Sequence, residues 1–153
     1  RGACPPELRD RVVAQMVALN DAAARAARTS GATAVTDVTG FGLLGHLHEM
    51  LRASETSVEI DVGSVPVIDG AAALLAEGFF PGGSGRNLTA VEPFLDGNAA
   101  DDDLKMLADA QTSGGLLIAT NDPDRLIGAL ASEGVEGSAI GHLTSEPGTR
   151  IRL

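Results

Sequence analysis

Apolar residues recur at helical spacing over the first part of the chain. Pro5 and Pro6 open this stripe, and Ser30 and Gly31 close it, which predicts one helix over 6–30. The apolar positions of the stripe are Leu8, Val12, Met16, Leu19, Ala23 and Ala26. The alanine-rich second half of the stripe would allow close approach to a sheet or to another helix.

Strands and helices alternate after this first stripe. A strand is expected at 33–37, a helix at 41–53 and a second strand at 57–61. The apolar residues of the 41–53 helix fall within an arc of about 120°, at 100° per residue: Leu43, Leu44, Leu47, Met50 and Leu51. A short alanine-leucine helix is expected at 70–77. The segment 78–103, which contains a glycine-rich run and an acidic run, is predicted to be irregular.

The last part of the chain predicts a strand, a helix and a closing hairpin. The apolar run 116–120 is typical of a buried strand. A helix is expected over 122–131, because Asp-Pro-Asp at its start places two acids in the first turn. Segments 135–143 and 150–153 are expected to complete the sheet as a hairpin around Glu-Pro-Gly at 146–148.

One stretch, 33–46, combines a carboxylate with several glycines between a predicted strand and a predicted helix. Asp37 stands near the end of the strand, and Gly40 and Gly42 follow before the helix. This order puts a carboxylate and bare backbone N–H groups at a helix N-terminus, where a metal-phosphate ligand is easily held. We therefore take this stretch as the candidate site, with Asp37 as the metal ligand.

The same glycines allow a second interpretation, a dinucleotide site. Gly40, Gly42 and Gly45 spell G-x-G-x-x-G, and Asp61 lies 21 residues beyond Gly40, where a ribose-binding acid would stand. Two arguments weigh against it. The first strand is polar at every second or third position, whereas a doubly wound sheet begins with a buried apolar strand. Asp37 would also repel a pyrophosphate unless a divalent cation lay between them. We favour the metal-phosphate interpretation.

Three separated motifs carry a family resemblance. They are the Asp-Gly motif at 36–46 (Thr-Asp-Val-Thr-Gly-Phe-Gly-Leu-Leu-Gly-His), the Gly-Arg-Asn motif at 81–87 (Pro-Gly-Gly-Ser-Gly-Arg-Asn) and the Gln-Thr-Ser motif at 109–117 (Asp-Ala-Gln-Thr-Ser-Gly-Gly-Leu-Leu). In this order they resemble the C-terminal domain of the selenophosphate synthetases (selenide, water dikinases), which belong to the aminoimidazole-ribonucleotide synthetase superfamily. The resemblance covers essentially the whole chain.

This resemblance implies a fold and an activity. The fold is α/β (α+β), a mixed β-sheet with helices packed on it. The activity is ATP-dependent phosphorylation of selenide, which yields selenophosphate, orthophosphate and AMP. Mg²⁺ and ATP are then the expected cofactor and co-substrate. Asp37 is the implied metal ligand, and Thr36, Gly40 and Gly42 are the implied cofactor-binding residues.

The resemblance also implies that residues 1–153 form a single C-terminal domain of a longer enzyme. The family's N-terminal domain, with its catalytic Cys or selenocysteine and most metal-binding aspartates, is not in this sequence, which also lacks an initiator Met. We therefore expect the chain alone to be inactive, with that domain as its partner and a homodimer as the full-length state. A non-catalytic module of the same fold, which pairs with itself or with another chain, is the alternative.

Composition and charge limit the kinds of partner and the cellular compartment that we expect for this chain. The net charge is −10, which argues against nucleic acid, since binding to its backbone requires clustered Lys and Arg. No apolar stretch approaches the roughly 18 residues of a membrane span, and no signal-peptide pattern is present. Cys4 is the only cysteine, so no disulfide can form within the chain. This suits a reducing compartment, and we expect a cytoplasmic protein.

The remaining polar residues leave several alternatives open. His46 and His48 lie about 200° apart around a helix, so they cannot bind the same metal ion. We expect both side chains to be partly buried at the two edges of the apolar stripe. Only His46 would lie near the glycine turn. The acidic run 101–103 is expected to be a solvated loop. Residues 111–115 form either a tight glycine turn or a polar rim of the active-site cleft. Arg86 would be available to a phosphate or to an acid of another domain.

Overall fold

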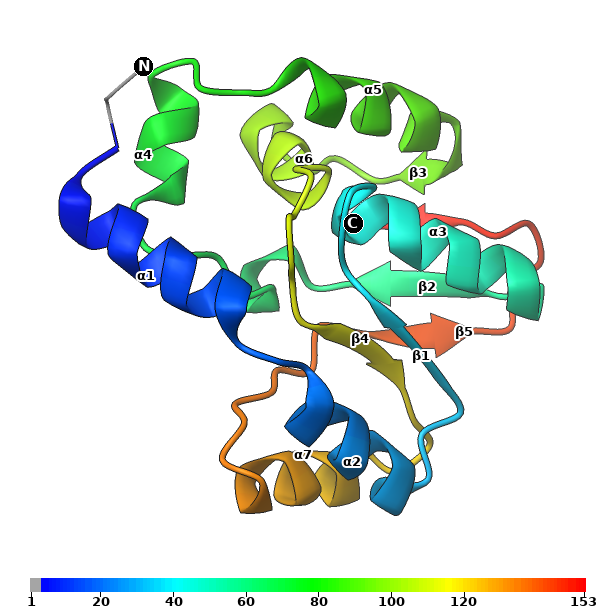
Figure 1. Cartoon of the computed structure of the whole chain (residues 1–153). Coiled ribbons are helices and arrows are strands. Elements are labelled where there is room, and N and C mark those ends of the chain that lie inside the picture. Colours follow the sequence, from blue (N-terminus) through cyan, green and yellow to red (C-terminus); the bar gives the residue numbers. More distant parts are fainter. Residues whose placement is uncertain (1–3) are drawn as a thin grey trace.

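The computed structural model describes residues 4–153, and its strands form two separate sheets. In the first, β1 (Ala34–Asp37) pairs antiparallel with β4 (Leu116–Ala119). The second has the order β3 (Leu95–Asp96), β6 (Ile151–Arg152), β2 (Ser57–Ile60), β5 (Gly141–Thr144). In this sheet β2 is antiparallel to β5 and parallel to β6, and β3 is parallel to β6. The predicted class, a mixed sheet with helices packed on it, is confirmed (Figure 1).

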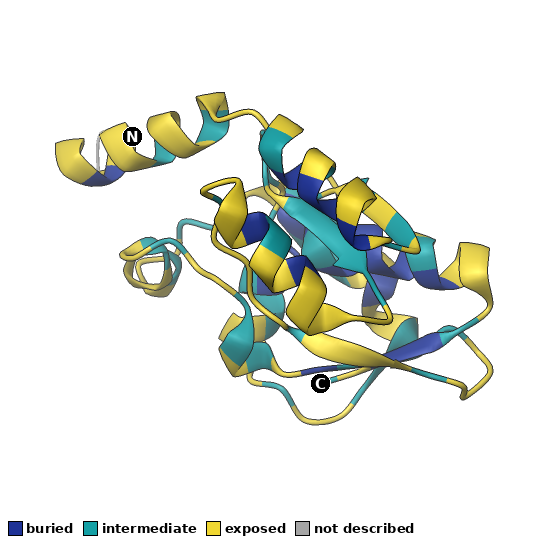
Figure 2. Cartoon of the chain, turned by 90° about the horizontal axis from the view of Figure 1, so that it is seen from below, coloured by how far each residue is buried: buried dark blue, intermediate teal, exposed yellow. Residues whose placement is uncertain are grey.

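The larger core lies between the four-stranded sheet and helix α3 (Gly42–Ser54). The stripe predicted for 41–53 supplies it, because Leu44, Leu47 and Leu51 are buried. From the sheet, Val58, Ile60 and Ile151 face this helix side, and α5 (Gly82–Val91) adds Val91. In Figure 2 the buried positions, coloured dark blue, lie mainly on helices and strands in the interior of the molecule.

A smaller core joins the two-stranded sheet to α2 (Asp21–Ser30) and α7 (Pro123–Ser132), which lie side by side in Figure 1. Its buried residues are Ala23, Ala26, Leu126 and Leu130. The helix predicted over 122–131 is confirmed as α7, and Asp122 caps it by accepting a hydrogen bond from the Arg125 N–H at 3.1 Å. The whole of β4 is only half-buried, so the prediction of a buried strand was too strong.

The single helix predicted over 6–30 is wrong, because the chain breaks into α1 (Pro6–Val17) and α2. At the break, the side-chain amide of Asn20 donates to the carbonyl of Gly114 at 3.0 Å. The two helices then pack on different partners. Leu8 of α1 lies against Gly70, just before α4 (Ala71–Ala76). Leu19, predicted to be in the apolar stripe, is 80% exposed.

The irregular segment predicted at 78–103 is also wrong. It contains α5, the short 3₁₀ helix η2 (Glu92–Phe94), strand β3 and helix α6 (Asp101–Leu107). Pro81 stands at the start of α5, and Ser84, Asn87, Leu88 and Val91 follow at helical spacing, which the glycines obscured. The acidic run 101–103 is the first turn of α6, where carboxylates are favoured by the helix dipole, and it is solvent-exposed.

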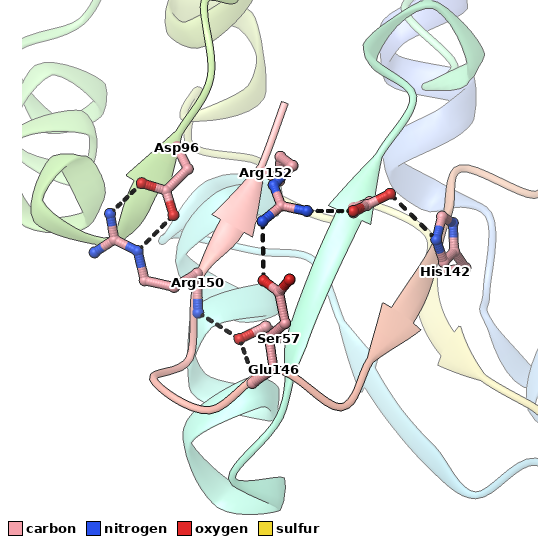
Figure 3. A network of polar contacts seen from close by, with 7 residues as sticks. Ser57, Asp96, His142, Glu146, Arg150 and Arg152 are labelled. Carbon is pink, nitrogen blue, oxygen red and sulfur yellow. Dashed lines mark hydrogen bonds and ion pairs between the residues drawn. The ribbon is translucent and has the colours of Figure 1, made fainter.

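The predicted hairpin of 135–143 with 150–153 does not form, because β5 and β6 lie on opposite sides of β2. Segment 135–140 is not a strand. Arg150 places β6 between β2 and β3: its N–H donates to the Ser57 hydroxyl, and its guanidinium binds the Asp96 carboxylate (Figure 3). These contacts cross more than fifty residues, so a local turn signal could not reveal them.

The predictions for 33–37, 41–53, 57–61 and 70–77 are confirmed as β1, α3, β2 and α4. None of the helices in residues 4–153 has both the length and the apolar character that crossing a bilayer requires.

Candidate functional site

Asp37 is the last residue of β1 and is solvent-exposed. It pairs with Leu116 of β4, and alternation along the strand puts its side chain on the same face as Val35, which is 46% exposed. Thr36 therefore points to the opposite face of the sheet, so these two predicted site residues do not share a side. Within residues 4–153 the Asp37 carboxylate makes no hydrogen bond or ion pair.

The turn that follows Asp37 is held by backbone hydrogen bonds to the Gln-Thr-Ser motif. Val38 donates to the carbonyl of Gly115 and accepts from the N–H of Gly114, both at 2.9 Å. The carbonyl of Thr39 accepts from Gln111 N–H at 3.0 Å. A Cβ on Gly114 would lie 2.5 Å from the Val38 carbonyl oxygen, so this close contact requires glycine. The first and third motifs thus form one unit.

The two predicted cofactor-binding glycines have different surroundings. Gly42 is buried with φ +68°, and a Cβ there would lie 2.6 Å from the carbonyl carbon and oxygen of Ala108. Its N–H donates to Thr39 within the turn at 3.0 Å. Gly40 is exposed, and no atom of a residue outside its immediate neighbours lies within 4 Å of a Cβ built on it. The structure therefore leaves Gly40 accessible, whereas Gly42 shapes the turn.

The Gly-Arg-Asn motif meets the other two through α5. The Asn87 side-chain amide donates to the carbonyl of Gly40 at 2.8 Å and to that of Ala108 at 3.2 Å. The buried Ser84 hydroxyl donates to the Asp109 carboxylate at 2.6 Å and accepts from the Ala110 N–H at 3.1 Å. The sequence does not indicate these contacts, although the helical spacing of Ser84 and Asn87 after Pro81 indicates that the two side chains share a face.

The two histidines of α3 are buried and have different neighbours. His46 Nε2 lies 3.1 Å from the Thr39 hydroxyl, so it contacts the glycine turn, as its position predicted. The His48 ring stacks on Phe94 with centroids 3.9 Å apart. Its Nε2 is buried without a hydrogen-bond partner in residues 4–153. Burial lowers the pKa of His48 below its usual 6.5, and the Arg52 charge lowers it further.

The residues expected at the cleft rim border a small cavity. The cavity has a volume of about 130 Å³. It is lined by Gln111, Thr112 and Ser113, and also by Met16 of α1 and by Ile68. The same segment also forms the glycine turn that contacts Val38. The turn interpretation of residues 111–115 is therefore confirmed, and their place at the rim of an active-site cleft stays a prediction.

The dinucleotide interpretation does not fit the fold. It requires the strands before and after the glycine-containing helix to be parallel in one sheet. Here β1 and β2 belong to different sheets, and the partner of β1 is antiparallel. The Asp61 carboxylate accepts from Gly63 N–H at 3.2 Å and Ser64 hydroxyl at 2.6 Å, so it caps the 3₁₀ helix η1 (Val62–Ser64).

Asp37 fits Mg²⁺ as a partial site. Residues 4–153 contain no group of three or more His, Cys, Asp or Glu side chains that could hold a metal by themselves. Mg²⁺ commonly takes one or two carboxylates and completes its coordination with waters and phosphates. A single exposed carboxylate without another partner is therefore suited to complete a site whose other ligands come from elsewhere.

Comparisons with known proteins cover nearly the whole chain. The model of the family "AIR synthase related protein, C-terminal domain" matches residues 6–153. A "Selenide, water dikinase" of Carboxydothermus hydrogenoformans is 41% identical over 152 residues, which cover 97% of this chain and 44% of that protein. Proteins of the same name from Yersinia pestis and Porphyromonas gingivalis are 40% and 44% identical, over 97% and 78% of this chain and 43% and 34% of their own lengths. The chain thus spans less than half the length of these curated relatives.

Proposed function

Because the chain belongs to the family of C-terminal domains of AIR synthase related proteins, we propose that it is the C-terminal part of a selenide, water dikinase. Its relatives of that name support this assignment. The reaction of the whole protein is then ATP-dependent phosphorylation of selenide to selenophosphate, with release of orthophosphate and AMP. A preceding domain supplies the nucleophile, and the full-length protein is a cytoplasmic homodimer.

The observation that carries this proposal is the exposed Asp37 carboxylate just ahead of the N-terminus of α3, where the N-cap residue Phe41 makes no side-chain cap hydrogen bond. Asp37 supplies one oxygen ligand to Mg²⁺. Gly40 has no side chain, so a phosphate group can approach its backbone, and the N-terminus of α3 favours that negative charge. Thr36 remains a proposed cofactor-binding residue. Bound Mg²⁺ supplies charge neutralisation on the phosphate oxygens, which is the main requirement of phosphoryl transfer.

The test is Asp37→Asn in the full-length protein. The substitution keeps the size of the side chain but removes the charge that a hard cation needs. We expect Mg²⁺-dependent formation of AMP to collapse, while the free energy of unfolding changes by less than about 1 kcal/mol.

Asp61→Asn is the matched control, because Asp61 is another exposed acid at a strand end. Asparagine retains an oxygen that can accept from Gly63, so this variant is expected to keep its activity. Wild-type activity in Asp37→Asn would contradict the proposed role of Asp37.

A further inference from the structure

Asn87 connects two loops that belong to different motifs. Its side-chain amide reaches from α5 to the carbonyl of Gly40 at 2.8 Å and to the carbonyl of Ala108 at 3.2 Å. Gly40 is in the turn after Asp37, and Ala108 follows α6. One side chain therefore fixes the glycine turn against the segment on which Gly42 packs.

The bond to Gly40 is not needed to satisfy a buried carbonyl. Gly40 is exposed and has open space around its Cβ position, so water would be an alternative partner for its carbonyl. Glycine also populates many backbone conformations. A hydrogen bond to an exposed glycine carbonyl therefore selects one orientation of the 40–41 peptide among several.

We propose that Asn87 is a positioning residue for the metal-binding turn, which it holds in the conformation that binds Mg²⁺ and phosphate beside Asp37. This inference rests on the proposed function. Outer partners that orient a metal site commonly change metal affinity or activity by about 10- to 100-fold when they are lost. Asn87 would act in this way through the backbone of Gly40.

Helix α5 has other attachments that stay in place without the Asn87 amide. The Ser84 hydroxyl bonds to Asp109 and Ala110, and Val91 is buried in the larger core. Alanine also has a higher helix propensity than asparagine, so Asn87→Ala does not weaken the helix itself. The variant therefore removes the two amide contacts, with Gly40 and with Ala108, while α5 stays attached through Ser84 and Val91.

The experiment compares Asn87→Ala with wild type in the full-length protein. We expect the Mg²⁺ concentration for half-maximal activity to rise by about 10- to 100-fold. Hydrogen exchange is followed on peptides that cover 38–46. We expect it to become faster at Gly42, because the Gly42 N–H donates to the Thr39 carbonyl in the glycine turn. Exchange is measured without ATP or selenide, so it does not depend on catalysis.

Two further variants make the result specific. Thr89→Ala is the control, because Thr89 is exposed on the same helix and, among the described residues, its hydroxyl bonds only to the Gly85 carbonyl within α5. It should match wild type in both measurements. Asn87→Asp keeps the size of the side chain but cannot donate when ionised, so it should change both measurements in the same direction as Asn87→Ala.

Unchanged exchange at Gly42, or an unchanged Mg²⁺ requirement in the Asn87 variants, would overturn the inference. If Asp37→Asn collapses activity while the Asn87 variants match wild type, only the role of Asn87 fails. If Asp37→Asn has wild-type activity, the proposed function fails, and the role of Asn87 in metal binding fails with it.

Discussion

Gly40 and Gly42 lie two residues apart in one turn, but their backbones have different requirements. Gly42 adopts φ +68° and packs on the Ala108 carbonyl group, so both its conformation and its neighbours exclude a side chain. Gly40 has neither restriction in the chain itself. At the level of single residues, Gly42 is therefore required by the turn, whereas the space beside Gly40 stays open.

Alanine substitution separates these two roles. Gly42→Ala is expected to lower the free energy of unfolding by about 2 kcal/mol or more, because it combines left-handed backbone strain with overpacking. Gly40→Ala is expected to change it by less than about 1 kcal/mol, because a loop residue without a steric conflict has little effect on folding. Urea unfolding of both variants measures this difference.

The same variants test the ligand role of Gly40 in the full-length protein. Gly40→Ala should weaken Mg-ATP binding through its methyl group, although the variant is as stable as wild type. Normal Mg-ATP binding by Gly40→Ala would contradict the proposed contact of Gly40 with the ligand. A Gly42→Ala variant as stable as wild type would contradict the close packing of Gly42 on Ala108.

The sequence predicted the contact of His46 with the glycine turn, because His46 and the turn lie within one local motif. The roles of Asp37 and Gly40 in that motif stay predictions. The sequence did not reveal the contact of Asn87 with Gly40. Those two residues are 47 positions apart, and a side-chain amide in a glycine-rich segment gives no signal of its partner. The site residues supplied by other elements therefore required the structure.

At the level of elements, α3 contacts both the site and the edge of the four-stranded sheet. His46 reaches the glycine turn, and His48 stacks on Phe94 in η2, which leads into the edge strand β3. The apolar stripe of α3 lies on the core. One helix thus fixes the turn relative to the sheet.

The buried His48 predicts acid sensitivity. Burial is the main cause of its lowered pKa, Arg52 adds to the effect, and Glu49 opposes it. In the unfolded chain His48 therefore takes up a proton near pH 6.5, whereas in the folded chain it does so only at lower pH. Stability should fall as the pH drops below about 6.5 and should not change through His48 above it.

Urea unfolding at pH 7.5 and 5.5 tests this expectation, with His48→Leu as the comparison. Leucine cannot titrate, so the loss of stability between the two pH values should be smaller in the variant than in wild type. An equal loss in both proteins would show that His48 does not contribute to it.

Elements also show where local patterns fail. The helical stripe continues through Ala18 and Leu19 without a breaking residue, yet Ala18 is extended with ψ 130°. The bond of Asn20 to Gly114 and the separate partners of α1 and α2 outweigh the helix propensity of this segment. In α5 the opposite occurs, because packing on α3 and the loops stabilises a helix that contains three glycines.

At the level of the whole molecule, two cores meet at the candidate site. The smaller core holds β1 and β4 against α2 and α7, and the larger core holds α3 against the other sheet. The Asp-Gly motif passes from one to the other, since it contains the end of β1 and the start of α3. The predicted family resemblance is confirmed by the match to residues 6–153.

A protein of these 153 residues alone is expected to show no selenide-dependent hydrolysis of ATP. The proposed site has one metal ligand in this chain, Asp37, and residues 4–153 contain no complete metal-binding group. Its melting temperature should also change little with millimolar Mg-ATP, since stabilisation follows RT ln(1 + [L]/Kd) and a partial site has a large Kd.

Comparison with a reaction that lacks protein measures the first expectation, and a thermal melt with and without Mg-ATP measures the second. Selenide-dependent turnover, or a shift of many degrees, would mean that the chain holds a more complete site than a single carboxylate provides.

The sequence by itself determined the elements that have a strong local signal, which are β1, α3, β2, α4 and the start of α7. It also determined the motif that contains Asp37, because strand, carboxylate and glycines follow one another directly. Only the tertiary structure decided which sheet each strand joins, where the first helix breaks and which side chain holds Gly40. Those outcomes depend on hydrogen bonds and packing between residues far apart in the chain, such as Arg150 with Asp96 and Asn87 with Gly40. Hydrophobic periodicity records only which face of an element is apolar, and not which partner covers it.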